Sequence, residues 1–162
     1  MSYNVSLPSY SVGTDVYKLV GSICAGYGPK AVAIGGHKAM AAVKDKLCKA
    51  IIDSDIEISD FIWYGGEASY ENVENLMSLE TVRNADMLFA IGGGKATDAV
   101  KTLADMTGKP VFTFPTIASN CSSCTSVSIM YKNNGIFLKP HFFANPPAHA
   151  FIDTEIIADS PK

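Results

Sequence analysis

Apolar residues along the chain form short continuous runs, separated by longer stretches with helical spacing. The runs lie at 31–34, 56–64, 87–91 and 111–114, and each predicts a strand. The stretches between them predict helices, because apolar residues recur three or four positions apart. The first has Met40, Val43, Leu47 and Ile51, and the second has Val73, Leu76 and Met77, with the charged Glu80 following the spacing less well. The third has Ala96, Ala99, Val100, Leu103 and Ala104. Strands that alternate with helices are typical of a parallel sheet in an α/β fold. Continuous rather than alternating apolar runs indicate that helices cover both faces of that sheet.

The pattern changes after Pro115. Residues 125–131 alternate between apolar and polar, and Asn133-Asn134-Gly135 then predicts a turn that leads into 136–138. This predicts a β-hairpin inserted after the fourth strand. A last short strand at 150–153 precedes a helical turn at 154–158.

Composition narrows the class of protein. The chain has 162 residues, of which 48% are hydrophobic and 18% charged, and its net charge is −3. These values favour one folded domain and argue against a nucleic-acid partner, which would require a basic surface. We expect no membrane partner, since no apolar run approaches the roughly 18 residues of a membrane span. Residues 1–10 lack the features of a secretory signal, and four cysteines are too few for a disulfide scaffold, so we expect a cytoplasmic protein with free thiols.

A glycine-rich segment, Gly92-Gly93-Gly94-Lys95, lies between the third strand and an amphipathic helix. Without Cβ atoms, the glycines allow a ligand's phosphates to approach the backbone N–H groups, and the helix N-terminus adds partial positive charge. The segment matches neither the Walker pattern nor G-x-G-x-x-G. It predicts a phosphate-binding loop, although a tight turn with a solvated lysine remains the alternative. Asp98, one turn later, suits a positive helix end in either case.

The sequence Gly92–Lys101 resembles the GGGKxxDxxK motif of the iron-containing alcohol dehydrogenase superfamily, and most closely its glycerol dehydrogenase branch. Four further stretches agree with the family in order and spacing, and they lie at 66–69, 114–119, 125–131 and 151–154. The resemblance implies a Rossmann-like domain over 1–162 that binds NAD or NADP.

The resemblance also implies roles for individual residues. Gly93, Gly94 and Lys95 would hold the pyrophosphate, and Asp98 would line the nicotinamide end. Thr116 and Ser119 would contact the cofactor beyond the fourth strand, and Thr125, Val127 and Tyr131 match cofactor-contacting positions of the hairpin. The position of Thr116 agrees with the rule that such folds bind ligands beyond the C-terminal ends of parallel strands.

The chain departs from the family near the first predicted strand. Members that use NAD often have an aspartate there, which binds the ribose hydroxyls and repels a 2′-phosphate. Here the matching position falls on His37, beside Lys38, so no carboxylate excludes NADP. Alternatively, both side chains are simply solvated next to a strand–helix turn. NAD and NADP therefore both remain open.

A second departure lies at Cys121, where glycerol dehydrogenases carry an aspartate that helps to bind the polyol. A thiol cannot accept hydrogen bonds from a diol as a carboxylate does. We therefore expect Cys121 to line a substrate pocket for a less polar alcohol, an aldehyde or a hydroxy acid. Cys121 and Cys124 also form a C-x-x-C pair, for which a redox motif and half of a zinc site are alternatives to a plain pocket wall.

Family chemistry is hydride transfer between an alcohol and the nicotinamide, assisted by a divalent metal, zinc or iron. In the family the metal ligands lie in a helical C-terminal domain, after the equivalent of Asp153-Thr154. We interpret His141, in a proline-bounded loop, and His149 as surface or loop histidines, and we assign no catalytic or metal-ligating residue to this chain. His149 and Asp153 would lie about 13 Å apart along a strand, too far to share one metal.

We accordingly expect the cofactor-binding half of a dehydrogenase, unable to turn over substrate alone and prone to form homo-oligomers through an uncovered apolar surface. Dehydroquinate synthase-like and glycerol-1-phosphate dehydrogenase-like enzymes share the glycine loop and are alternatives. A nucleotide-binding module without catalysis is a third.

Overall fold

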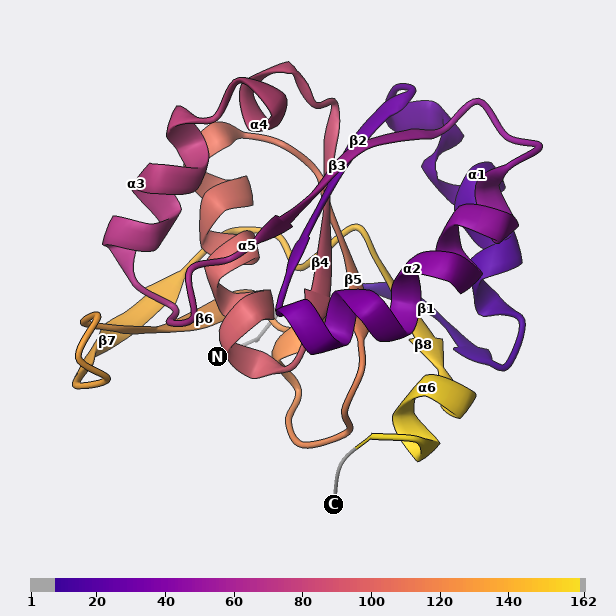
Figure 1. Cartoon of the computed structure of the whole chain (residues 1–162). Coiled ribbons are helices and arrows are strands. Elements are labelled where there is room, and N and C mark those ends of the chain that lie inside the picture. The colour runs from indigo at the N-terminus through magenta and orange to yellow at the C-terminus, as the bar shows by residue number, and fades with distance from the viewer. Residues whose placement is uncertain (1–7, 161–162) are drawn as a thin grey trace, which may run out of the picture.

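The computed structural model describes residues 8–160 (Figure 1). The strands are β1 (Ser9–Gly13), β2 (Lys30–Gly35), β3 (Glu57–Trp63), β4 (Met87–Gly92), β5 (Val111–Pro115), β6 (Val127–Tyr131), β7 (Phe137–Phe142) and β8 (His149–Asp153). The α-helices are α1 (Val20–Cys24), α2 (His37–Ile51), α3 (Tyr70–Ser78), α4 (Glu80–Asn84), α5 (Gly94–Thr107) and α6 (Thr154–Ala158). Short 3-10 segments lie at Val16–Leu19, Ala25–Tyr27 and Ser122–Cys124. No helix in this described range is long and apolar enough to cross a membrane.

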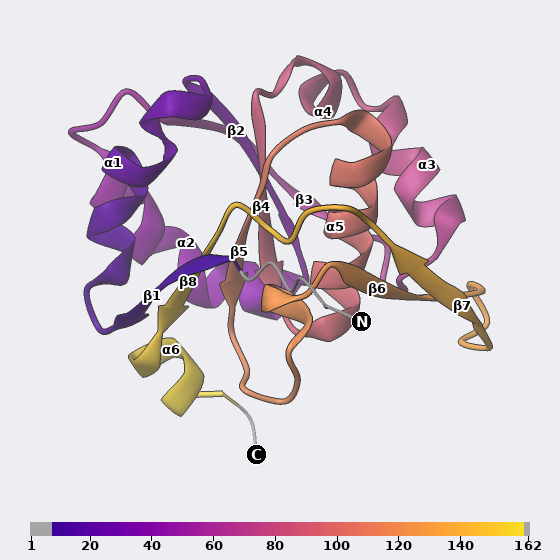
Figure 2. The same cartoon turned by 180° about the vertical axis from the view of Figure 1, so that it is seen from behind.

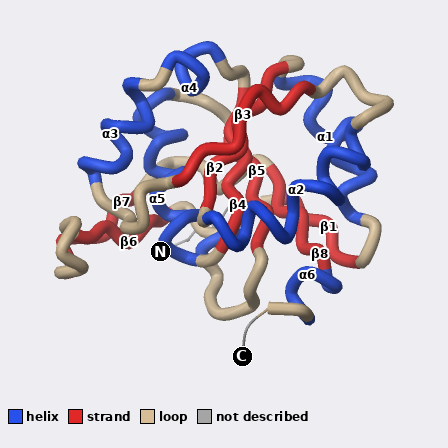
Figure 3. The backbone as a smooth tube through the Cα atoms, in the orientation of Figure 1, coloured by secondary structure: helices blue, strands red, loops and turns tan. Residues whose placement is uncertain are grey.

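Six strands form one parallel sheet in the order β1-β8-β5-β4-β2-β3, and β6 pairs with β7 in a separate antiparallel hairpin. The strands lie between helices in Figure 3, and the hairpin lies beside α5. Seen from behind, β1 and β8 form one edge of the sheet next to α6 (Figure 2). This confirms the predicted α/β class, the parallel sheet and the inserted hairpin.

Each central strand sends alternate side chains into two separate cores. Ala31, Ala33, Phe89 and Ile91 pack against α1 and α2, whereas Val32, Ile34, Leu88 and Ala90 pack against α3, α4 and α5. Because both faces are covered, every position in β4 is buried, which explains why its sequence is continuously apolar.

The N-terminal elements were not predicted from the hydrophobic pattern. β1 is an edge strand with exposed apolar side chains at Tyr10 and Val12, and it has the parallel strand β8 as its partner. His149 of β8 holds it in place, since the ring's Nδ1 and Nε2 lie 2.7 and 2.9 Å from the hydroxyls of Ser9 and Ser11. Interpreting His149 as a surface or loop residue was therefore wrong, because it is a buried strand residue.

Two further predictions need correction. The helix expected to include Glu80 is broken at Leu79, whose extended backbone starts a second helix and lets Val82 reach the core. His141 lies in strand β7 rather than in a loop. Its Nε2 is 2.9 Å from the carboxylate of Asp105 on α5, so it helps to attach the hairpin to that helix.

Candidate functional site

The glycine loop joins the end of β4 to the start of α5 at the carboxyl edge of the sheet. Gly92 has φ 142°, a backbone conformation that side-chain-bearing residues rarely adopt. Gly93 is the N-cap of α5, and no side chain caps this helix within the described residues. Helix α2 begins nearby in the same way after Gly36, whose nitrogen would be 4.0 Å from a Cβ placed on Gly92. Two uncapped helix N-termini therefore meet here, and both favour an anion.

Two hollows flank this loop. The first, of about 270 Å³, is lined by Gly36, Ala39, Tyr64, Gly92, Gly93, Gly94, Lys95, Ala96 and Ile117. The second, of about 370 Å³, lies towards the hairpin and is lined by Gly94, Lys95, Asp98, Asn120, Cys121, Ser122, Thr125, Val127, Ile129 and Tyr131. Gly94 and Lys95 belong to both walls, so a ligand with two ends joined by phosphates could lie across the loop.

Lys95 supplies the full positive charge at this position. Its ammonium is 2.6 Å from Oε2 of Glu67, and the hydrogen bond to this carboxylate raises the pKa of Lys95. The lysine side chain is 55% exposed and that of Glu67 only 11%, so the lysine can turn towards a ligand while the glutamate stays. Lys95 also lies 5.7 Å from the ring centre of Tyr131 on the hairpin.

Asp98 is fixed by several donors. The hydroxyl of Ser122 donates to its Oδ1 at 2.6 Å, the backbone N–H of Ile129 donates to its Oδ2 at 3.1 Å, and the ammonium of Lys101 is 3.1 Å from Oδ1. Lys101 is fully buried, and this burial lowers its pKa. The same ammonium donates to the carbonyl of Val127 at 2.6 Å. Together these contacts attach α5 to the turn at 122–124 and to the hairpin.

Most of the residues singled out from the sequence meet at this loop. The second hollow brings together Gly94, Lys95, Asp98, Cys121, Thr125, Val127 and Tyr131, and Gly93 lines the first.

The remaining three, His37, Thr116 and Ser119, do not line either hollow. His37 stacks on the ring of Trp63 at 5.4 Å, at the start of α2. Thr116 is buried and its backbone N–H donates to the carbonyl of Gly92 at 3.3 Å, whereas Ser119 is exposed.

Four further side chains belong to the site although the sequence did not single them out. They are Glu67, Lys101, Asn120 and Ser122. Lys101 and Glu67 stood within stretches that matched the family, which was the available signal. The Asn120 amide lies close to Gly94, because a Cβ on Gly94 would come within 2.5 Å of the amide nitrogen and would push this exposed side chain aside.

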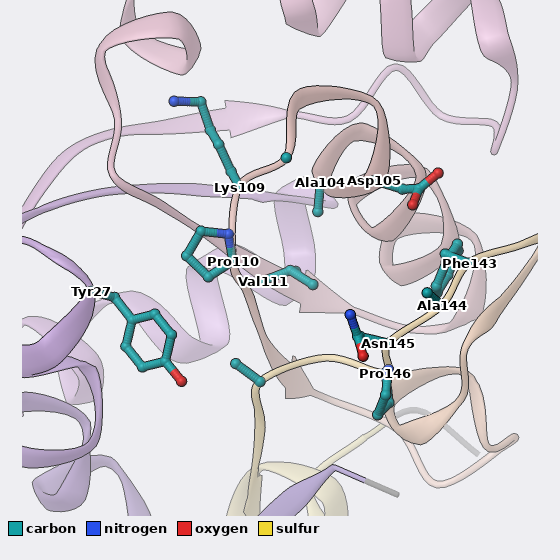
Figure 4. A pocket seen from close by; sticks show the side chains of 12 residues that line it. Tyr27, Ala104, Asp105, Lys109, Pro110, Val111, Phe143, Ala144, Asn145 and Pro146 are labelled. Atoms are coloured by element: carbon teal, nitrogen blue, oxygen red, sulfur yellow. The ribbon is translucent and has the colours of Figure 1, made fainter. Parts of the chain in front are cut away.

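A larger hollow of about 560 Å³ lies at the opposite end of the sheet, where β5 begins and α5 ends (Figure 4). Tyr27, Asp105, Val111 and Asn145 are among its lining residues. The C-terminus of a helix carries partial negative charge and disfavours a phosphate. Size alone therefore does not make this hollow the nucleotide site.

The described residues contain no group of three or more histidine, cysteine, aspartate or glutamate side chains placed to hold a metal ion. This part of the chain thus does not fit the zinc or iron that the family resemblance implies.

A doubly wound parallel sheet with a glycine loop at its carboxyl edge defines an α/β domain of the ligand-binding kind. The chain belongs to the iron-containing alcohol dehydrogenase family, whose model matches residues 8–154.

Relatives support this assignment. A glycerol dehydrogenase of Escherichia coli O6:H1 is 29% identical over 154 residues, which are 94% of this chain and 41% of the relative. A glycerol dehydrogenase of Thermotoga maritima is 40% identical over 98 residues, 60% of this chain and 27% of the relative. The crystal structure of a probable glycerol dehydrogenase from Sinorhizobium meliloti superposes with a TM-score of 0.85 at 22% identity, over 99% of this chain and 43% of that one. The chain therefore spans less than half the length of each of these relatives.

Proposed function

We propose that residues 1–162 form the NAD- or NADP-binding domain of a metal-dependent alcohol or polyol dehydrogenase, which transfers hydride between an alcohol carbon and the nicotinamide. The observation that carries this proposal is the lysine-bearing glycine loop between two hollows, at the meeting point of two uncapped helix N-termini. Families with this fold bind dinucleotides at such a point. The nicotinamide supplies the hydride acceptor when it is bound.

The chain's own residues would bind and orient the nucleotide. The N–H groups at the start of α5, together with Gly93 and Gly94, would hold the pyrophosphate, and Lys95 would turn to it from Glu67. Asp98 would line the nicotinamide end of the second hollow with Thr125, Val127 and Tyr131. Thr116 and Ser119 would contact the cofactor from beyond β5.

The choice between NAD and NADP would depend on the end of β2. His37 starts α2 and stacks on Trp63, and Lys38 follows it. No acidic residue lies in the first turn of α2 to repel a 2′-phosphate, so the proposal includes both nucleotides.

The substrate would lie next to Cys121, which is exposed in the wall of the second hollow near Lys95 and Asp98. A thiol favours a small alcohol, aldehyde or hydroxy acid with less hydrogen bonding than glycerol. We assign the zinc or iron, hydride transfer itself and the homo-oligomer to the complete cytoplasmic enzyme, because this chain matches only 41% of the E. coli relative.

Isothermal titration of the chain with NADH and with NADPH tests the proposal. We expect binding of at least one nucleotide, and Lys95→Gln should weaken it by about fivefold, since an exposed charge–phosphate contact contributes about 1 kcal/mol. Lys49→Gln, at the far end of α2, is the matched control and should leave the affinity unchanged. Failure of both nucleotides to bind at millimolar concentration, or an equal affinity for the Lys95 variant, would refute the proposed site.

A further inference from the structure

Two free cysteines lie beside the second hollow without a role in nucleotide binding. Cys121 is exposed in its wall and Cys124 is partly buried. The backbone N–H of Cys124 donates to the carbonyl of Cys121 at 2.9 Å, which closes a 3-10 turn between them. A turn of this kind brings the two Cα atoms within about 7 Å, and disulfides span about 4.4–6.8 Å between Cα atoms. The Cα separation in this turn is therefore compatible with a disulfide between the two cysteines.

Access favours thiol reactivity at this turn. Cys121 is exposed in the wall of the second hollow, so a small disulfide can reach its sulfur. Cys24 is the contrasting case, because it is fully buried and its burial raises its pKa to about 12.

We propose that Cys121 and Cys124 form a thiol–disulfide exchange site that reacts with low-molecular-weight disulfides. The thiolate of Cys121 attacks one sulfur of the small disulfide, forming a mixed disulfide and releasing one small thiol. The thiolate of Cys124 then attacks the Cys121 sulfur, forming the internal disulfide and releasing the second small thiol. Two electrons pass from the cysteine pair to the small disulfide, and the two cysteine protons end on the two released thiols.

The turn is connected to the glycine loop through the residues beside and between the cysteines. The hydroxyl of Ser122 donates to Asp98 at 2.6 Å, and the N–H of Ser122 donates to Asn120 at 3.0 Å. The amide of Asn120 in turn lies against Gly94. A disulfide would tighten this turn and draw the Cys121 sulfur along the hollow wall. We expect oxidation to weaken NADH binding by about fivefold; this consequence rests on the proposed function, whereas the disulfide does not.

The first experiment incubates the chain with oxidised glutathione, alkylates the remaining thiols after unfolding and locates them by mass spectrometry. In the wild-type chain and in the control Cys48→Ser, we expect the segment with Cys121 and Cys124 to lose two hydrogen atoms and to resist alkylation. In Cys121→Ser and in Cys124→Ser, the remaining cysteine of the pair should be either a free thiol or a mixed disulfide with glutathione. Circular dichroism checks that each variant is folded. Wild-type thiols at 121 and 124 that stay alkylatable, or that carry two separate glutathione groups, would overturn the exchange site.

The second experiment titrates NADH into the oxidised chain and into the chain reduced with dithiothreitol. A weaker affinity that recovers on reduction supports the link between turn and hollow, and Cys124→Ser should show no such difference. Equal affinities of the two forms overturn that link. If neither form binds NADH, the proposed nucleotide site fails, while the mass measurement still decides whether the disulfide forms.

Discussion

Glu67 competes with a bound phosphate for Lys95, and this competition can be measured. Its carboxylate is 2.6 Å from the ammonium of Lys95, which lines both hollows, so it repels an anion that approaches Lys95. In the wild-type chain, the N–H of Ala68 donates to Oε1 of Glu67 at 3.0 Å. Glu67→Gln removes the charge but keeps an oxygen that can accept this hydrogen bond. The variant should therefore keep its fold and bind NADH more tightly.

The size of the effect follows from Coulomb's law. Two unit charges about 4 Å apart interact by about 1 kcal/mol in water and by several times more near a protein surface, and the exposure of Lys95 keeps the effect near the lower value. We expect about fivefold tighter NADH binding by isothermal titration at low salt, with a smaller gain at high salt. Glu71→Gln, in the first turn of α3, removes the same charge away from Lys95 and should change little. Weaker binding by the Glu67 variant would mean that Glu67 positions Lys95 rather than competing for it.

Three further predictions concern stability, measured by urea unfolding. Gly35→Ala should lower the free energy of unfolding by about 3 kcal/mol, because the new Cβ would lie 2.1 Å from the backbone oxygen of Ile91. Gly26→Ala is the control, since its Cβ would meet no atom within 4 Å. Equal urea midpoints for the two variants would count against the packing argument. Lys101→Met should cost about 3 kcal/mol, since it leaves a buried carboxylate without its ammonium partner, and a neutral result would show that the hydroxyl and N–H donors suffice. Burial lowers the pKa of His149 in the folded chain, so the unfolded chain binds more protons below pH 6.5. The free energy of unfolding should therefore fall as the pH drops from 6.5 through the lowered pKa. His149→Gln should remove that part of the pH dependence, and an unchanged profile would contradict this explanation.

The parallel sheet could be predicted because its central strands are buried on both faces, and their sequences are therefore continuously apolar. β4 is the clearest example, with every position buried. β1 carries no such signal, because it is an edge strand whose pairing partner, β8, lies about 140 residues away in the sequence. The buried position of His149 has no local signal for the same reason, since the two serines that contact its ring come from β1.

The candidate site likewise combines a feature that the local sequence indicates with contacts between residues that lie far apart in the sequence. The glycine loop is a local feature of strand, turn and helix, so the sequence indicates it directly. Lys101 is a local partner of Asp98, but its other two partners come from positions 122 and 129, across a turn and a hairpin whose docking no local pattern reveals. Lys101 is fully buried, which is rare for lysine, and only the surrounding carboxylate and carbonyl oxygens explain it.

The most direct test of the central claim is to locate the nucleotide by NMR, following the backbone amide signals of the ¹⁵N-labelled chain during titration with NADH. We predict the largest changes at Gly93, Gly94 and Lys95, with smaller ones at the hairpin positions Val127 and Tyr131. Changes confined to the opposite hollow in Figure 4, or no changes at saturating NADH, would contradict the assignment of this loop as the nucleotide site.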